Sequence, residues 1–120
     1  MSKKVLLVED DALVRQSLAR VLVSKGLDVI EAANGKEGLA KAAEVDLVVT
    51  DVRMPEMDGL QMVEAMRKDE KLKAKPVIIL SNDEQPGTLN QALEAGVTVY
   101  LSKNNQDAES IAGQILAAAG

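Results

Sequence analysis

The chain has 120 residues, 47% of them apolar, and a formal net charge of −5, which is enough for one domain with its own core and excludes a disordered chain. Cysteine and histidine are both absent, which excludes disulfides, catalytic thiols, histidine bases and the usual zinc ligands. The negative charge and a single aromatic residue, Tyr100, disfavour direct binding to nucleic acid.

Short runs of valine, isoleucine and leucine between turn-forming residues predict five strands. In chain order these runs occupy residues 5–8, 27–30, 46–50, 76–80 and 97–101. Three of them are nearly continuous apolar runs without strict alternation. Such runs are typical of parallel strands that are covered on both faces.

Apolar residues at helical spacing predict a helix after each strand. Gly26 and Gly96 are expected to end the first and fourth of these helices. Strands and helices that alternate five times predict an α/β fold, with parallel strands, right-handed crossovers and helices on both faces. No linker interrupts the pattern, so we expect residues 1–120 to form a single domain. The apolar stripes are Val14, Leu18, Val21 and Leu22; Leu39, Ala42 and Ala43; Leu60, Val63 and Met66; Leu89, Ala92 and Leu93; and Ala108, Ile111, Ala112, Ile115 and Leu116.

Polar residues follow the predicted strands at their carboxyl ends, where an open parallel sheet binds its ligand. For Asp11, a helix N-cap and a place in the site are equally favoured. Asp58-Gly59 is expected to form a turn that leads into the third helix, and Asp83 is expected to cap a helix or lie in a solvated loop. The residues after the strands are Glu9, Asp10 and Asp11 after the first, Asp51 after the third, Ser81 after the fourth and Lys103 after the fifth.

Carboxylates that gather at one edge of a sheet repel one another unless a cation lies among them. Mg²⁺ suits such oxygen ligands, and its open coordination positions leave room for a phosphoryl group. Lys103 can then neutralise one phosphoryl oxygen, and the Ser81 hydroxyl can bind another. A carboxylate can itself be the nucleophile, and Asp51 is the best candidate because its strand ends between the others.

These motifs together resemble response-regulator receiver domains, the phospho-accepting part of two-component signalling. The resemblance covers essentially the whole chain. It rests on LLVEDD at residues 6–11, on Asp51-x-x-Met54-Pro55 with Asp58-Gly59-Leu60 after it, and on Ser81 and Lys103. Each motif is weak alone, but their order and spacing within the β-α alternation make the combination specific.

The resemblance implies a doubly wound, flavodoxin-like sandwich whose parallel sheet has the strand order 2-1-3-4-5. It implies that Asp51 is the phosphorylation site and that Lys103 pairs with the phosphoryl group. Asp10 would bind Mg²⁺ directly and Glu9 through water. The further roles that it implies are an Mg²⁺ ligand for the backbone carbonyl of Arg53, phosphoryl contact for Ser81, and a rotamer switch for Tyr100.

The resemblance also implies a function. A phosphohistidine on a sensor histidine kinase or a histidine phosphotransfer protein would donate its phosphoryl group to Asp51 in an Mg²⁺-dependent reaction. The face of the fourth helix, fifth strand and fifth helix would then change toward a downstream output protein or output domain. Such a chain is a signalling phospho-acceptor that assists its own phosphorylation and dephosphorylation, rather than an enzyme.

Several alternatives share parts of this pattern. The serious one is a pseudo-receiver that binds proteins independently of phosphorylation, against which the full set of site residues argues. A flavodoxin-type electron carrier would be repelled by the acids after the first strand, and an aspartate phosphatase needs an acid where Arg53 stands. A stand-alone receiver and a fragment of a longer regulator remain equally open.

Two further expectations concern the loop after Lys103 and the location of the protein. Lys103 is followed by Asn104 where the family usually has proline, so a trans peptide bond is expected there. No apolar run approaches the roughly 18 residues that a membrane helix needs, and the first run is too short for a signal peptide. We therefore expect a cytoplasmic protein with no membrane attachment.

Overall fold

The sheet of this protein contains five parallel strands in the order β2-β1-β3-β4-β5. The computed structural model describes residues 3–82, 85–104 and 106–119. The predicted α/β fold and strand order are confirmed, and each strand begins and ends within two residues of its predicted range. The strands are β1 (Lys4–Val8), β2 (Asp28–Ala32), β3 (Leu47–Thr50), β4 (Val77–Ser81) and β5 (Val99–Ser102).

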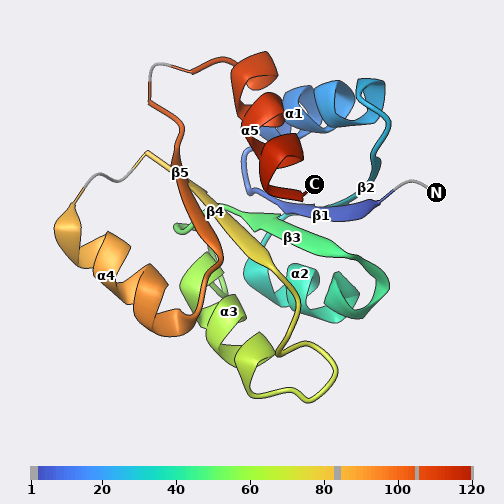
Figure 1. Ribbon diagram of the computed structural model, residues 1–120. Coiled ribbons are helices and arrows are strands. Elements are labelled where there is room, and N and C mark those ends of the chain that lie inside the picture. The colour runs from blue at the N-terminus through green and yellow to red at the C-terminus, as the bar shows by residue number, and fades with distance from the viewer. Residues whose placement is uncertain (1–2, 83–84, 105, 120) are drawn as a thin grey trace.

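Helices cover both faces of the sheet, as the strand–helix alternation predicts (Figure 1). One face is covered by α1 (Ala12–Ser24) and α5 (Ala108–Ala119). The other is covered by α2 (Gly35–Lys41), the short 3₁₀ helix η1 (Ala42–Glu44), α3 (Gly59–Arg67) and α4 (Pro86–Ala95). The protein therefore has two hydrophobic cores that share one sheet.

Side chains of β1 show why the strand sequences lack alternation. Leu6 and Val8 pack into the core beneath α2, α3 and α4, whereas Val5 and Leu7 pack into the core beneath α1 and α5. All four side chains are at most 1% exposed. Because both faces of the strand are buried, every position favours an apolar residue.

The predicted helix stripes are mostly confirmed. Leu60, Val63 and Met66 of α3 are buried, as are Ile111, Ala112 and Ile115 of α5. In α1, Leu18 and Leu22 are buried and Val21 packs beside them, but Val14 is 42% exposed. After β2, Ala42 is buried and Leu39 is partly buried, whereas Ala43 is exposed.

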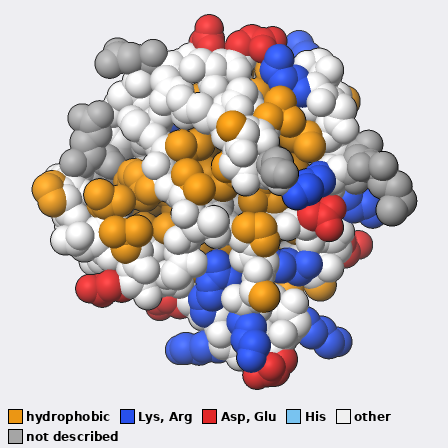
Figure 2. Space-filling view, in the orientation of Figure 1, with side chains coloured by type: hydrophobic (Ala, Val, Ile, Leu, Met, Phe, Trp, Pro, Cys, Tyr) orange, Lys and Arg blue, Asp and Glu red, His pale blue; other side chains and the backbone are white. Residues whose placement is uncertain are grey.

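The stripe predicted for α4 is confirmed at Ala92 and wrong at Leu89 and Leu93. Leu89 and Leu93 are 40% and 59% exposed, whereas Thr88 and Ala92 are buried against the sheet. Thr88 and Ala92 are one helical turn apart, so this narrow stripe of small side chains forms the packed face. The larger leucines turn outward, and Figure 2 shows hydrophobic side chains exposed where α4 and β5 lie.

Glycines end two of the helices. Gly26 and Gly96 have φ angles of 93° and 91°, the left-handed geometry that terminates a helix, as predicted. Lys3 Nζ donates to the carbonyl oxygen of Ala119 at 2.5 Å, so the last described residue of α5 lies close to the start of β1. Within the described ranges, no helix is both long enough and apolar enough to cross a membrane.

Candidate functional site

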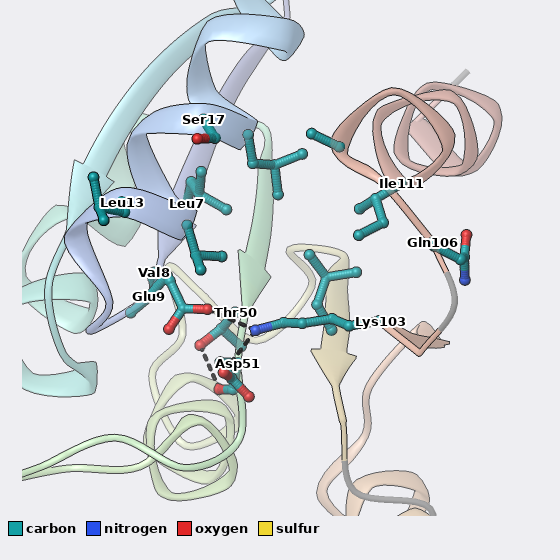
Figure 3. Close-up of a pocket in the computed structure, with 14 residues that line it drawn as sticks. Leu7, Val8, Glu9, Leu13, Ser17, Thr50, Asp51, Lys103, Gln106 and Ile111 are labelled. Carbon is teal, nitrogen blue, oxygen red and sulfur yellow. Dashed lines mark hydrogen bonds and ion pairs between the residues drawn. The ribbon is translucent and has the colours of Figure 1, made fainter.

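Three charged residues from separate strands converge at the carboxyl edge of the sheet (Figure 3). Glu9 follows β1, Asp51 follows β3 and Lys103 follows β5. The Nζ atom of Lys103 lies 2.6 Å from Glu9 Oε1 and 2.8 Å from Asp51 Oδ2. The prediction that these residues converge is confirmed.

Asp10 joins Glu9 and Asp51 in a cluster of acids. One carboxylate oxygen from each of the three lies within 4.8 Å of the others, a spacing that can hold a metal ion. Glu9 is buried, Asp51 is half-buried and Asp10 is exposed, so the cluster opens toward solvent on one side. An all-oxygen ligand set with access for water suits a hard cation such as Mg²⁺.

The loop between β1 and α1 holds these acids through backbone contacts. The Glu9 amide donates to the Ala32 carbonyl oxygen at 3.0 Å. Asp11 is the N-cap of α1, and its carboxylate accepts from the amides of Leu13 and Val14 at 3.0 and 3.2 Å. Of the two alternatives for Asp11, the structure supports the helix cap.

Asp51 is fixed by contacts that the sequence did not indicate as part of the site. The amide of Val52 donates to Asp51 Oδ1 at 2.6 Å, and the Thr50 hydroxyl donates to the Asp51 carbonyl oxygen at 2.9 Å. A Cβ atom at Gly59 would overlap that carbonyl oxygen. A polar residue in an otherwise apolar strand is the only signal for Thr50, and Asp58-Gly59 enters the sequence analysis as a turn and as part of the family motif, without a contact to Asp51.

Asp58 begins α3 as expected and completes the loop that follows Asp51. Its carboxylate accepts from the Gln61 amide at 2.8 Å, while the Gln61 side chain accepts from the Asp58 amide at 3.0 Å. This reciprocal pair is a capping box, which fixes the start of the helix. Asp83, expected in a loop, lies outside the described residues.

A hollow lies beside Asp51 on the β4 side. Its volume is about 310 Å³, and it is lined by Asp51, Arg53, Ser81 and Asn82. Ser81 ends β4 and is 2% exposed, whereas Arg53 is exposed. The hollow therefore places a hydroxyl and a guanidinium-bearing residue beside one face of the Asp51 carboxylate.

Lys103 is presented by a loop held against β4. Its amide donates to the Ser81 carbonyl oxygen at 2.9 Å, and the Asn104 side chain donates to the carbonyl oxygen of Asn82 at 3.3 Å. No cis peptide bond occurs among the described residues, so the bond between Lys103 and Asn104 is trans as expected. Tyr100 is half-buried in β5 and packs against the core beneath α2, α3 and α4.

The ionisation of this cluster reflects burial and close charges. Burial raises the pKa of Glu9 above its ordinary value, although the hydrogen bond and charge of Lys103 oppose the shift. Burial alone would lower the pKa of Lys103, but the hydrogen bonds and charges of Asp51 and Glu9 outweigh it and raise the pKa. Lys103 therefore stays cationic.

An apolar cavity of about 370 Å³ lies behind the ion pairs, between α1 and α5 (Figure 3). Leu13, Leu18, Leu80 and Ile111 are among its lining residues, together with Lys103. Such a wall lowers the local dielectric constant, which strengthens the interactions between Lys103 and the two carboxylates.

Comparison with known proteins identifies the family. A model described as the response regulator receiver domain matches residues 5–113. The chain belongs to the response-regulator receiver domain family. Receiver domains are the signalling phospho-acceptors of two-component systems, in which they interact with kinases and downstream effectors. This membership decides against the flavodoxin-type carrier and the aspartate phosphatase.

Individual relatives carry the receiver in proteins of different length. A chemotaxis protein CheY homolog of Campylobacter jejuni is 35% identical over 104 residues, which are 83% of this chain and 80% of that protein. A gliding motility regulatory protein of Myxococcus xanthus is 33% identical over 114 residues, 93% of this chain but 15% of its own length. The transcriptional regulatory protein PdtaR of Mycobacterium tuberculosis is 35% identical over 104 residues, 84% of this chain and 49% of its length.

The fold agrees with solved receiver structures. Chemotaxis protein CheY4 of Vibrio cholerae matches with a TM-score of 0.89 and 31% identity, over 98% of this chain and 99% of that one. The CheY-like receiver domain protein of Methanospirillum hungatei matches with a TM-score of 0.87 and 25% identity, over 99% of this chain and 94% of that one. The present chain is thus a CheY-like receiver domain in sequence and in fold.

Proposed function

We propose that this chain accepts a phosphoryl group on Asp51 from a phosphohistidine of a sensor histidine kinase or a histidine phosphotransfer protein. The observation that carries the proposal is the position of Asp51. Its carboxylate lies within the acidic cluster, contacts Lys103 at 2.8 Å, and borders the hollow that contains Ser81. A nucleophile, a cation site and a place for an anion therefore adjoin one another.

In the proposed reaction, a carboxylate oxygen of Asp51 forms a bond to phosphorus as the phosphorus–nitrogen bond of the phosphohistidine breaks. Glu9, Asp10, Asp51 and the backbone carbonyl of Arg53 would hold Mg²⁺. When bound, this ion offsets the charge that develops on the phosphoryl oxygens. The Lys103 ammonium pairs with one phosphoryl oxygen, and the Ser81 hydroxyl donates a hydrogen bond to another.

The proposed output is a change in the face formed by α4, β5 and α5. The phosphoryl group adds roughly −1.5 to −2 charge and three acceptor oxygens beside Ser81. Movement of Ser81 toward them would allow Tyr100 to turn inward and would alter this face for a downstream output protein or output domain. In this proposal, residues 1–120 act in the cytoplasm as a single receiver domain that is a phospho-acceptor, not an enzyme.

The first prediction tests the phosphorylation site. Replacing Asp51 with Asn removes the nucleophilic carboxylate, so we expect no phosphoryl adduct after incubation with Mg²⁺ and a small phosphodonor. The intact mass of the protein measures the adduct directly. The variant Asp58→Asn is the matched control, because it makes the same change beside the site and asparagine caps a helix as well as aspartate does.

The wild type and Asp58→Asn should both gain the phosphoryl mass. A retained adduct of unchanged stoichiometry in Asp51→Asn would show that another residue is the acceptor. If the wild type gains no phosphoryl group and its Asp51 amide signal does not shift with beryllofluoride, the pseudo-receiver is the correct function instead.

A further inference from the structure

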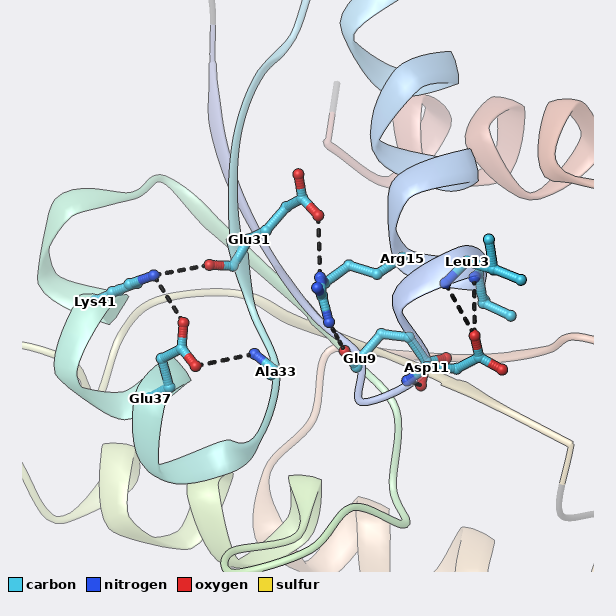
Figure 4. A network of polar contacts seen from close by, with 9 residues as sticks. Glu9, Asp11, Leu13, Arg15, Glu31, Ala33, Glu37 and Lys41 are labelled. Carbon is cyan, nitrogen blue, oxygen red and sulfur yellow. Dashed lines mark hydrogen bonds and ion pairs between the residues drawn. The ribbon is translucent and has the colours of Figure 1, made fainter.

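Arg15 links the acidic loop to β2 through two hydrogen bonds (Figure 4). Its Nη1 atom donates to the Glu9 carbonyl oxygen at 2.8 Å, and its Nε atom donates to Glu31 Oε1 at 3.0 Å. The Arg15 side chain is only 15% exposed and the Glu31 side chain is 41% exposed, so the bond to the Glu9 carbonyl oxygen is the better shielded of the two. The guanidinium is thus a bridge between the loop after β1 and the strand beside it.

This bridge completes the fixation of Glu9. The Glu9 amide is bonded to Ala32, its carboxylate to Lys103, and its carbonyl oxygen to Arg15. Because a peptide bond is planar, holding the Glu9 carbonyl oxygen also fixes the direction in which the chain enters Asp10. Arg15 therefore influences two members of the acidic cluster without contacting either carboxylate.

The partner of Arg15 is itself anchored by α2. Lys41 Nζ donates to the Glu31 carbonyl oxygen at 2.8 Å and to Glu37 Oε1 at 3.0 Å. The Ala33 amide donates to Glu37 Oε2 at 3.3 Å, and the hydrogen bond from Lys41 lowers the pKa of Glu37. The end of β2 is consequently held in place, and Glu31 can orient the guanidinium of Arg15.

We propose that Arg15 is a positioning residue of the metal site, which holds the loop of Glu9 and Asp10 in the geometry that binds a divalent cation, and that Glu31 acts through Arg15. This inference rests on the proposed function, because it assigns Mg²⁺ to the acidic cluster. Arg15 is not a ligand, since its guanidinium is a donor and never an acceptor.

The sign of the expected effect separates positioning from simple electrostatics. A guanidinium beside a cation site repels the cation, so its loss should by charge alone tighten Mg²⁺ binding. If Arg15 positions the loop, its removal should weaken binding despite the lost repulsion. Residues that orient metal ligands typically change metal affinity by about 10- to 100-fold, and we expect the low end of that range here.

The test is a calorimetric titration of the full chain with MgCl₂. In Arg15→Ala, the Mg²⁺ dissociation constant should rise about tenfold. Arg15→Lys retains the positive charge and one donor nitrogen, so it should recover part of the lost Mg²⁺ affinity. Arg20→Ala is the matched control, because it removes the same charge from an exposed position of the same helix and should not weaken binding.

Glu31→Ala tests the second half of the proposal. It should also weaken Mg²⁺ binding, and the double variant with Arg15→Ala should bind no more weakly than Arg15→Ala alone. Additive losses would show that Glu31 acts independently of Arg15. Unchanged or tighter Mg²⁺ binding in Arg15→Ala would overturn the positioning role itself.

Amide hydrogen exchange without added metal separates this proposal from the proposed function. In Arg15→Ala, the amides of Glu9 and Asp11 should exchange faster than in the wild type, while those of α5 stay unchanged. Unchanged exchange of the Glu9 and Asp11 amides would overturn the positioning role even if the wild type bound no Mg²⁺. A wild type without Mg²⁺ binding but with faster exchange in Arg15→Ala would overturn only the metal assignment.

Discussion

Glu9 is a charged residue that the fold buries, although its carboxylate would be more stable in water. Its side chain is buried among the site residues, and burial raises its pKa even though Lys103 lies 2.6 Å away. The neighbouring charge of Asp51 raises the pKa further. A buried acid of this kind lowers stability, a cost that its proposed role in binding a cation would explain.

Glu9→Gln should therefore stabilise the protein at pH 7 in the absence of divalent metal, by on the order of 1 kcal/mol. The raised pKa means that the folded state holds the Glu9 proton more tightly than the unfolded state does. The unfavourable effect of the charge is thus absent below about pH 4.5, the ordinary value, and is complete above the folded pKa. Urea unfolding at several pH values should show the advantage of Glu9→Gln at pH 7 and its disappearance in acid.

An advantage that stayed constant across this pH range would contradict the assignment to ionised Glu9. The same variant should bind Mg²⁺ more weakly than the wild type, because it loses a carboxylate from the acidic cluster.

At the scale of residues, the acids were predictable and their supports were not. Parallel strands end at one edge, so Glu9, Asp51 and Lys103 could be placed together from their positions after strands. The roles of Arg15 and Thr50 depend on which carbonyl oxygens their donors reach. These contacts depend on the tertiary structure. Helical spacing in the sequence shows which residues share a face of a helix, but not which loop packs against that face.

The loop between β3 and α3 shows how an element positions a functional residue. It must return close to its own start, since the Gly59 amide donates to the Val52 carbonyl oxygen at 2.8 Å. The Gly35 amide also holds this loop, because it donates to the Met57 carbonyl oxygen at 2.9 Å. The backbone of Asp51 is thus enclosed by the start of α3.

Gly59→Ala should destabilise the protein by about 1–3 kcal/mol, because the added methyl group would overlap the Asp51 carbonyl oxygen. Gly113→Ala in α5 is the control. Apart from the backbone of its own helix, no described heavy atom lies within 4 Å of a Cβ atom at Gly113, so alanine should there stabilise the helix by about 0.5–1 kcal/mol. Chemical denaturation of both variants measures the difference. Equal stabilisation by the two substitutions would refute the close approach at Gly59.

Element boundaries were predictable where local chemistry defines them. Gly96 and Asp58 marked the end of α4 and the start of α3 correctly, since caps act within one turn. The buried face of α4 was predicted correctly at Ala92 but wrongly at Leu89 and Leu93. The pattern of Leu89, Ala92 and Leu93 favoured an apolar buried face, but the sheet accepts the smaller Thr88 and Ala92. Side-chain volume at a helix–sheet contact is set by the partner surface, which the helix sequence does not contain.

The whole molecule unfolds as one unit if both cores depend on the shared sheet. Leu22 of α1 is fully buried in one core, whereas Leu93 of α4 is 59% exposed on the other side. Leu22→Ala should cost about 2–5 kcal/mol in the free energy of unfolding. Leu93→Ala should change it by less than about 0.5 kcal/mol, because it removes little buried surface.

The measurement is the protection of backbone amides in both helical layers, followed during thermal unfolding. In Leu22→Ala, amides in α1 and in α3 should lose protection together, since losing one core exposes the sheet on which the other rests. Separate transitions for the two layers would show that the cores are independent.

The contact between Lys3 and Ala119 has a consequence for constructing derivatives of this receiver. Lys3 and Ala119 meet beside the start of β1, whereas Glu9 and Asp51 lie at the opposite rim of the sheet. A fluorescent reporter or a surface tether attached beside Lys3 or Ala119 would consequently lie away from the proposed phosphorylation site. A short peptide bridge between Lys3 and Ala119 would likewise leave the carboxyl edge of the sheet unchanged.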